Sequence, residues 1–421
     1  MRVAALATCI IATCVSSARA DDPPRPDLVF VANPNFGIEP GARTTLNAGR
    51  LLFRYQELLP SITKFDESRP SGKALGILGR TLQFGFLDGP LAHMETTVTH
   101  ELFGHGARAR EFGGKPAYVF GLPLPYSLFL APQQQTSGVA FYNTDPRNLD
   151  QDIALHFGGL ESNFLTAHWI NTEMVNARGW ARHSDLLVYA ISKVTYVTTF
   201  VSRDLRGQRG AVGDDIDSYV NALQDKFNHW RPNQRVTIAK NLQTAYLWNL
   251  IDPTLVFSLY STLVNFIYHG KRESKMPLPS VNGVTFYPSP RFNLSPFGAE
   301  HYLDLFLTKG DVVVDAYGRI GSSGLASYTG AGVRALGWKP HKSVSLGAEV
   351  DVWKQPALQL EERNLYTRPD EWGVNVGGFA TVKILGKLGL TGKFAYKSRG
   401  YLQGQPLDAT PYGYLGVSIA P

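Results

Sequence analysis

The pattern of apolar and polar positions changes near residues 275–283, where the chain reads KMPLPSVNG. Before this segment apolar residues recur at helical spacing, and after it they alternate with small or polar residues. A period of two places successive side chains on opposite faces of a strand, whereas a period of 3.6 marks one face of a helix. The sequence therefore predicts an α+β protein, with a mainly helical domain over residues 21–275 and an antiparallel β-barrel over residues 284–421.

The second half contains about eight candidate strands between Val284 and Ala420, separated by short turns. The segment SVSLGAEVDVW places one apolar set on a single face: Val344, Leu346, Ala348, Val350 and Val352. GVNVGGFATVKI and LGLTGKFAY repeat this alternation. Eight strands of about ten residues with one apolar face are typical of a small outer-membrane barrel. A soluble barrel or sandwich with its apolar face inward is the alternative, because the pattern does not fix the direction of that face.

The first twenty residues have the composition of a secretory signal peptide. They combine Arg2, an apolar run and an A-x-A-type end at residues 18–20. Both cysteines, Cys9 and Cys14, fall inside this segment, so the mature chain has no disulfide and no thiolate ligand. An exported protein without disulfides suits a bacterial envelope, and any metal in it must be held by His, Asp or Glu.

Charge and composition indicate which classes of binding partner the protein can have. The predicted signal peptide carries Arg2 and Arg19, so the mature chain keeps 39 basic against 35 acidic residues, a net charge of +4. No cluster of Lys and Arg with interleaved aromatics occurs, which argues against nucleic acid as a partner. Charged residues make up only 18% of the chain and aromatics 12%. This balance favours contact with outer-membrane lipid, with periplasmic localisation as the alternative.

The predicted helix over residues 90–112 carries the most specific chemistry, in TTVTHELFGHGARAREFGG. His100 and Glu101 begin as a zinc-protease H-E-x-x-H motif would, but the second histidine comes one residue late, at His105. At 100° per residue, positions i and i+5 lie about 140° apart, too far to hold one ion. One π-type bulge absorbs the extra residue and realigns them, and Gly104 is a permissive place for it.

The stretch HELFGH resembles the H-E-x-x-G-H signature of the dipeptidyl peptidase III family of zinc peptidases, over about a dozen residues. The resemblance implies that His100 and His105 bind zinc and that Glu101 activates water. It also implies a third ligand, a glutamate on a later helix. The rest of the chain does not share the family pattern.

Glu161, in HFGGLESNFLTAHW, is the best candidate for that third ligand. It lies on a long helical pattern running from residue 148 towards 178 and interrupted at the glycines 158–159. His156 and His168 on the same segment are rival ligands. His168 is seven residues from Glu161 and shares its face, so it is also a candidate to hydrogen-bond the substrate oxygen.

Three protein ligands leave a fourth zinc position for water, whose proton a neighbouring carboxylate can take. The sequence thus predicts an exported zinc-dependent hydrolase, with a peptide or protein substrate, anchored in a bacterial outer membrane. One alternative is a non-catalytic outer-membrane receptor or assembly protein with a structural or degenerate metal site. Another is a zinc-dependent hydrolase of lipid or cell-wall substrates. Around residues 117–132 and 136–142, extended segments could flank a cleft, or simply pack as hydrophobic loops.

Overall fold

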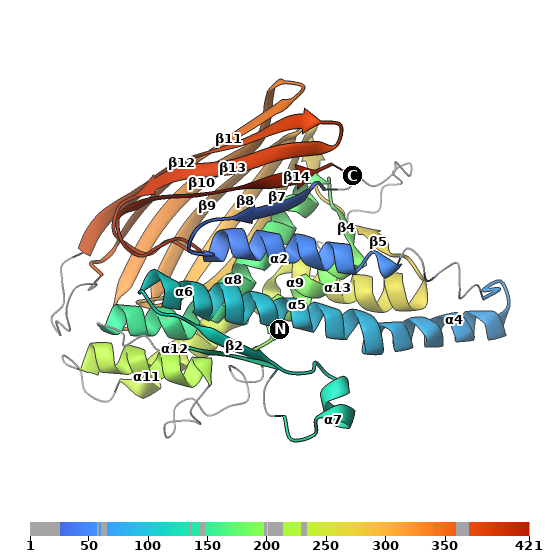
Figure 1. Cartoon of the computed structure of the whole chain (residues 1–421), viewed down its shortest axis with the longest axis horizontal. Helices are drawn as coiled ribbons and strands as arrows, with labels where there is room; N and C mark the ends of the chain where they lie inside the picture. Colours follow the sequence, from blue (N-terminus) through green and yellow to red (C-terminus); the bar gives the residue numbers. More distant parts are fainter. Residues whose placement is uncertain are drawn as a thin grey trace.

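In the computed structural model, a curved antiparallel sheet arches over a layer of helices (Figure 1). The structure describes residues 26–56, 59, 65–134, 137–142, 148–197, 200, 214–228, 234–358 and 370–420. The predicted signal peptide, with both cysteines, lies outside these residues. The α+β class is confirmed: helices occupy most of the first 270 residues, and the sheet is built mainly from those that follow.

The sheet has ten strands in the order β1-β14-β13-β12-β11-β10-β9-β8-β7-β6, with each adjacent pair antiparallel. Eight of them account for the predicted strand region: β7 (Val284–Ser295), β8 (Gly298–Lys309), β9 (Val312–Ser322), β10 (Ser327–His341), β11 (Val344–Pro356), β12 (Asp370–Leu385), β13 (Leu388–Lys397) and β14 (Thr410–Ile419). The ends are β1 (Leu28–Ala32) and β6 (Ser280–Val281), and in the described part of the chain no pairing joins them. The sheet is therefore open, and the predicted closed barrel is not confirmed.

The apolar face of the sheet points outward, away from the helices. On β12 the even-numbered residues are exposed, and Trp372 has 74% of its surface accessible. On β13 and β14, Phe394 and Leu415 are 71% and 77% exposed. Charged residues instead line the concave face, where Lys393 is buried and pairs with Glu349 at 2.7 Å. The sequence did not fix which way the apolar face of the sheet points. In the structure this face points outward, and the polar face points inward.

Helices fill the concave side of the sheet. The longest, α8 (Leu149–Asn176), contributes Phe164 to a core that also contains Phe292 of β7 and Tyr401 of the β13–β14 connection. Gly158 and Gly159 do not interrupt α8, contrary to the prediction from sequence. They lie instead where α8 packs closely against the segment of Gly104 and His100. The predicted helical part and the sheet therefore share one hydrophobic core.

The open edge of the sheet at β1 is covered by α2 (Ile38–Leu52). Thr44 Oγ1 accepts from Val31 N at 2.8 Å and donates to Val31 O at 2.6 Å. Asn47 Nδ2 donates to Val29 O at 3.0 Å. Two side chains of a helix thus take the place of a further strand at an edge that would otherwise present unpaired backbone groups.

The remaining helices form the layer below the sheet. They are α4 (Pro70–Gln83), η1 (Phe84–Asp88), α5 (Gly89–His100), η2 (Glu101–His105), α6 (Gly106–Glu111), α7 (Tyr126–Leu130), α9 (His183–Val194), α11 (Asp215–Asn228), α12 (Arg235–Tyr246), η3 (Leu247–Ile251), α13 (Pro253–Tyr260) and η4 (Ser261–Tyr268). Two small sheets pair β2 (Ala117–Phe120) with β3 (Gly138–Phe141) and β4 (Trp180–Arg182) with β5 (Glu273–Lys275). No single described helix meets the length and hydropathy of a membrane span, and one pair bent by 55°, 235–251 with 253–268, meets them jointly.

Candidate metal centre

A π-helical turn aligns the two histidines of the H-E-x-x-G-H segment. The helix is α-helical through His100, becomes a π-helix over Glu101–His105, and returns to α-helix from Gly106. The bulge predicted from the five-residue spacing is therefore present, and it brings His100 Nε2 within 3.1 Å of His105 Nε2.

Glycines let this π-turn sit tightly against α8. A Cβ on Gly104 would lie 2.5 Å from the Cα of Gly159, and one on Gly159 would lie 2.3 Å from the His100 ring. Real Cβ atoms essentially never approach so closely. Gly104 and Gly159 therefore allow the backbone contact that places the His100 ring, and this explains why both helices carry glycine where they cross.

Asp215, the first residue of α11, completes the group. Its Oδ2 lies 2.9 Å from His100 Nε2 and 3.3 Å from His105 Nε2. Both histidines are buried, with 7% of the His100 side chain and 6% of the His105 side chain exposed. His100, His105 and Asp215 thus form a group that could hold a metal ion.

The donor geometry fits a tetrahedral ion. Bonds of about 2.0–2.1 Å at tetrahedral angles separate two ligand atoms by about 3.3 Å. The three separations between the donor atoms of His100, His105 and Asp215 are 2.9, 3.1 and 3.3 Å. Two imidazoles and one carboxylate are also a ligand set of catalytic zinc sites, which keep the fourth position open.

A neighbour of each histidine bears on its tautomer. His105 Nδ1 lies 2.6 Å from the backbone oxygen of Leu155, which can only accept, so in the neutral imidazole Nδ1 carries the hydrogen and Nε2 presents its lone pair. Asn163 Nδ2 is 3.2 Å from His100 Nδ1, while Asn163 Oδ1 is buried without a partner. Rotating this amide by half a turn would let Oδ1 accept from His100 Nδ1, satisfy the orphaned oxygen and free Nε2 of His100 for an ion.

The charges of His105 and Asp215 shift each other's pKa. Burial lowers the pKa of His105, but the Asp215 carboxylate outweighs this effect and raises the pKa to about 9. Burial likewise works to raise the pKa of Asp215, but His105 and His100 hold it well below its ordinary value. Without a metal, the centre is therefore an ion pair between an imidazolium and a carboxylate.

Glu101 lies beside this group, on the side of β3. A Cβ added to Gly138, the first residue of β3, would lie 2.9 Å from Glu101 Cγ and 2.6 Å from Thr97 Cγ2. The charge of Glu101 also contributes to raising the pKa values of His105 and Tyr196. The carboxylate predicted as proton acceptor is thus close to the ligands without being one of them.

Tyr196 is a site residue that the sequence reasoning missed. Its hydroxyl donates to Asp215 Oδ2 and lies 3.3 Å from His100 Nε2. Burial and the charge of Asp215 raise the pKa of Tyr196 well above 10, so the phenol keeps its proton. A neutral hydroxyl at this position can donate a hydrogen bond to a substrate oxygen.

Glu161, predicted as third ligand, is not part of this group. Its carboxylate accepts from Arg108 Nη2 at 2.7 and 2.8 Å and from the backbone nitrogen of Gly404 at 2.7 Å. Gly159 of α8 contacts His100, and a residue two positions later points about 200° around the helix from it. Glu161 therefore faces away from the histidines and neutralises a buried arginine instead.

The rival histidines also lie elsewhere. His156 is paired with Asp152 at 3.4 Å, one turn earlier on α8. His168 belongs to a second group, with Asp304 and Asp315, that could by spacing hold a metal. His168 follows Asn163, the neighbour of His100, by five residues, or about 140° around the helix. His168 therefore faces the sheet, so the predicted contact with a substrate oxygen at His100 is not supported.

An arginine weakens the case for an ion in that second group. Arg291 Nε and Nη2 donate to the two oxygens of Asp304 at 2.9 and 2.8 Å. This carboxylate is already neutralised by a cation, so a metal ion would have to displace or neighbour a guanidinium. In the part of the chain that the structure describes, no arginine or lysine bonds to Asp215, the carboxylate of the His100 group.

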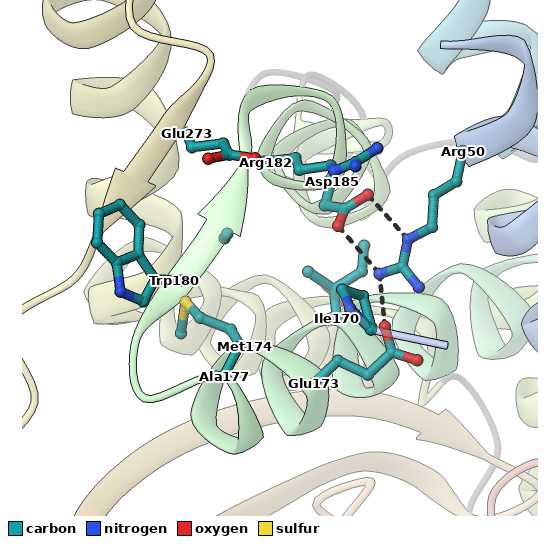
Figure 2. Close-up of a pocket in the computed structure, with 11 residues that line it drawn as sticks. Arg50, Ile170, Glu173, Met174, Ala177, Trp180, Arg182, Asp185 and Glu273 are labelled. Atoms are coloured by element: carbon teal, nitrogen blue, oxygen red, sulfur yellow. Dashed lines mark hydrogen bonds and ion pairs between the residues drawn. The ribbon is translucent and has the colours of Figure 1, made fainter. Parts of the chain in front are cut away.

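A further hollow, next to the end of α8, is structural in character (Figure 2). There Arg50 of α2 donates to Asp185 of α9 at 3.1 and 3.0 Å and pairs with Glu173 of α8. The dashed lines of Figure 2 show one guanidinium joining three helices. Both charges of the Arg50–Asp185 pair are buried. The pair therefore holds the helices together and is not free to bind a ligand.

Comparison of the chain with models of protein families, with curated proteins and with solved structures found no match.

Proposed function

We propose that this protein is an exported zinc-dependent hydrolase that cleaves peptide amides and is anchored by its sheet in a bacterial outer membrane. The observation that carries the proposal is the convergence of His100, His105 and Asp215 with Glu101 beside them. Three donors at tetrahedral spacing supply a site with one open position. The adjacent carboxylate of Glu101 is not a ligand and can accept a proton from water, a function that a purely structural metal site would not need.

Each residue has a separate role in this proposal. His100, His105 and Asp215 would hold the ion, which would supply Lewis acidity, polarising a carbonyl and lowering the pKa of a water to about 7. Glu101 accepts the proton of the attacking water and delivers it to the leaving amine. The single hydroxyl hydrogen of Tyr196, which goes to Asp215 in the metal-free protein, would turn to the oxygen of the scissile carbonyl as negative charge develops there. β3, beside Glu101, offers an extended backbone along which a substrate can lie.

The outer face of the sheet supports the membrane placement. Exposed Trp338 near one end of the strands and Trp372 near the other bracket an apolar band. Trp338 pairs with Leu346, whose partner Ala380 lies eight residues from Trp372 along β12. Eight residues of a strand span about 26 Å. The apolar band of outer-membrane sheets is about 25 Å tall and flanked by aromatic residues.

An open sheet in lipid requires covered edges, because unsatisfied backbone groups are costly in hydrocarbon. The cover that α2 gives to β1 meets this requirement at one end. At the other end the sheet finishes with the two-residue strand β6, and η3 contacts its neighbour β7. The sheet can therefore face lipid on its outer side while helices occupy the inner side.

The proposal is tested by comparing wild type with Glu101→Gln, both loaded with zinc. A mixture of peptides is incubated with each protein and the products are identified by mass spectrometry. Glu101→Gln keeps the ion and the fold, and its rate is expected to fall by about 10²-fold or more, the usual contribution of a general base. Equal cleavage by both proteins, or none by either, would contradict the enzymatic role and leave only a metal-binding protein.

A further inference from the structure

An apolar pocket lies on the same helix as the metal centre, towards the N-terminal end of α5. Its volume is about 390 Å³, within the range of small-molecule sites. Pro90, Leu91 and Met94 of α5 form one wall. Leu122 and Pro123, in the segment between β2 and α7, form another together with Tyr126 at the start of α7. In Figure 1 this segment hangs beside the helix layer, on the side away from the sheet.

The pocket and the candidate catalytic carboxylate share one face of the helix. Pro90, Met94, Thr97 and Glu101 follow one another at spacings of four, three and four residues, which places them in a single stripe. Met94 precedes Glu101 by two turns, or about 10 Å. Gly138 of β3 sits over Thr97 and Glu101, and Ser137 bonds to His93 at 2.9 Å. The β2–β3 hairpin therefore borders the stripe from the metal centre to the pocket.

The lining offers almost nothing to a polar ligand. Seven of the nine lining residues are aliphatic, Phe or Pro, and the two polar ones are Tyr55 and Tyr126. The Tyr55 hydroxyl is bonded to Asp88, and that of Tyr126 to the backbone oxygen of Phe86. A peptide backbone inside the pocket would lose its hydrogen bonds to water without replacement, whereas a hydrocarbon chain loses none. The distance from Glu101 is also greater than one amino-acid side chain reaches.

The mouth of the pocket carries exposed apolar residues. Tyr126 is the first residue of α7, and Leu128, Phe129 and Leu130 of this helix are 64%, 71% and 72% exposed. Three adjacent exposed apolar side chains on a short helix suit insertion among lipid tails. A hydrocarbon chain could thus pass from a lipid surface into the pocket.

We infer that this pocket holds the long acyl chain of the substrate, so that the hydrolase acts on acylated peptides, with the scissile amide about two helical turns from the chain. This inference rests on the proposed function for the cleavage step and on the pocket itself for the binding step. Binding and cleavage are therefore tested by separate experiments.

The binding experiment uses the full chain, exchanged from detergent into an amphipathic polymer, and a fluorescent polyene fatty acid as probe. We expect saturable binding, equal in wild type and Glu101→Gln. Met94→Trp fills the pocket and should weaken binding by at least about tenfold, since each buried methylene contributes about 0.8 kcal/mol. Leu78→Trp on α4, where Leu78 is exposed and does not line the pocket, is the matched control and should bind normally. Leu91→Phe replaces Met94→Trp if the latter loses its zinc or its thermal transition.

Probe binding that is absent in wild type, or unchanged in both pocket variants, would overturn the pocket as an acyl site. The cleavage experiment compares acetyl, octanoyl and palmitoyl forms of one peptide. We expect kcat/KM to rise with chain length in wild type and to be flat in Met94→Trp. A flat series in wild type, or a phospholipid that displaces the probe better than the palmitoyl peptide, would overturn the substrate assignment. If the probe binds but wild type cleaves no peptide faster than Glu101→Gln does, the proposed function is contradicted and the acyl pocket stands.

Discussion

Oδ2 of Asp215 lies 2.9 Å from Nε2 of His100, although the two residues are far apart in sequence and belong to different helices. Asp215 opens α11, and His100 ends the α-helical part of α5. This contact, rather than one with Glu161, gives the two histidines a carboxylate partner. It makes the ligand set testable residue by residue.

The first prediction separates the two candidate carboxylates. Purified protein should bind about one zinc ion per chain, as the three-donor set implies. His100→Ala and Asp215→Asn should lose the ion, because each removes one of the three donors. Glu161→Gln should keep it, because Glu161 pairs with Arg108 instead. Elemental analysis of each variant, together with circular dichroism, checks this result.

Glu161→Gln should nevertheless destabilise the protein. The side chains of Arg108 and Glu161 are 1% and 0% exposed, and removing the charge of Glu161 leaves the buried Arg108 with Glu111 as its remaining carboxylate partner. Breaking such a pair typically costs about 3–5 kcal/mol. Loss of zinc from a Glu161→Gln protein that unfolds normally would restore Glu161 as a ligand.

The second prediction concerns pH. The pKa of His105 is raised to about 9 in the metal-free protein, so its imidazolium stabilises that state fully below the ordinary value of 6.5. This contribution is lost as the pH rises through 9, so stability without metal should fall over that range. Zinc requires the neutral imidazole, so apparent zinc affinity should rise by about tenfold per pH unit up to 9.

Titration calorimetry and thermal unfolding between these pH values check both signs. Metal-free protein should become less stable as the pH rises, whereas the stabilisation by added zinc should grow. Zinc affinity that does not change over this range would show that no proton leaves the site on binding, contrary to the ion pair between His105 and Asp215.

The third prediction tests the π-turn. Deleting Leu102 changes the spacing of His100 and His105 from five residues to four, which an ordinary α-helix aligns. The deleted chain should keep its zinc and its fold, because the bulge can relax and return α6 to its place. Zinc content and thermal stability measure the outcome. Gly104→Ala is the contrasting variant: its Cβ would meet Gly159 at 2.5 Å, so it should destabilise the helix crossing by about 1–3 kcal/mol.

Sequence periodicity predicted those features that depend on neighbours along the chain. The alternation in β11 and β12 placed residues correctly on opposite faces, and the five-residue histidine spacing required a π-turn that the structure contains. α11 begins at Asp215, where a negative charge suits the first turn of a helix. The contact of Asp215 with the histidines could not be predicted in this way, because it depends on how α11 packs against α5 and α8.

The open sheet illustrates the same limit. Strand count follows from turns and alternation, but closure depends on whether the first and last strands meet. Here β1, from the part of the chain predicted to be helical, extends the sheet, and α2 covers its edge through Thr44 and Asn47. The same period-two pattern is compatible with an apolar face on either side, so the direction of that face required the packing of α8.

The last prediction tests the outer face of the sheet. Val376 is 53% exposed near the middle of β12, and Leu385 is 76% exposed at its end. If lipid covers this face, Val376→Arg should cost about 2–4 kcal/mol at the centre of the bilayer, whereas Leu385→Arg near the interface should cost about 0–1 kcal/mol. Val376→Arg should therefore reduce the fraction of protein recovered with outer membranes and its heat-dependent gel migration, while Leu385→Arg should behave as wild type. If water covers the face instead, both arginines are tolerated equally and the protein stays dispersed without detergent, which would contradict the membrane anchor while leaving the metal centre untouched.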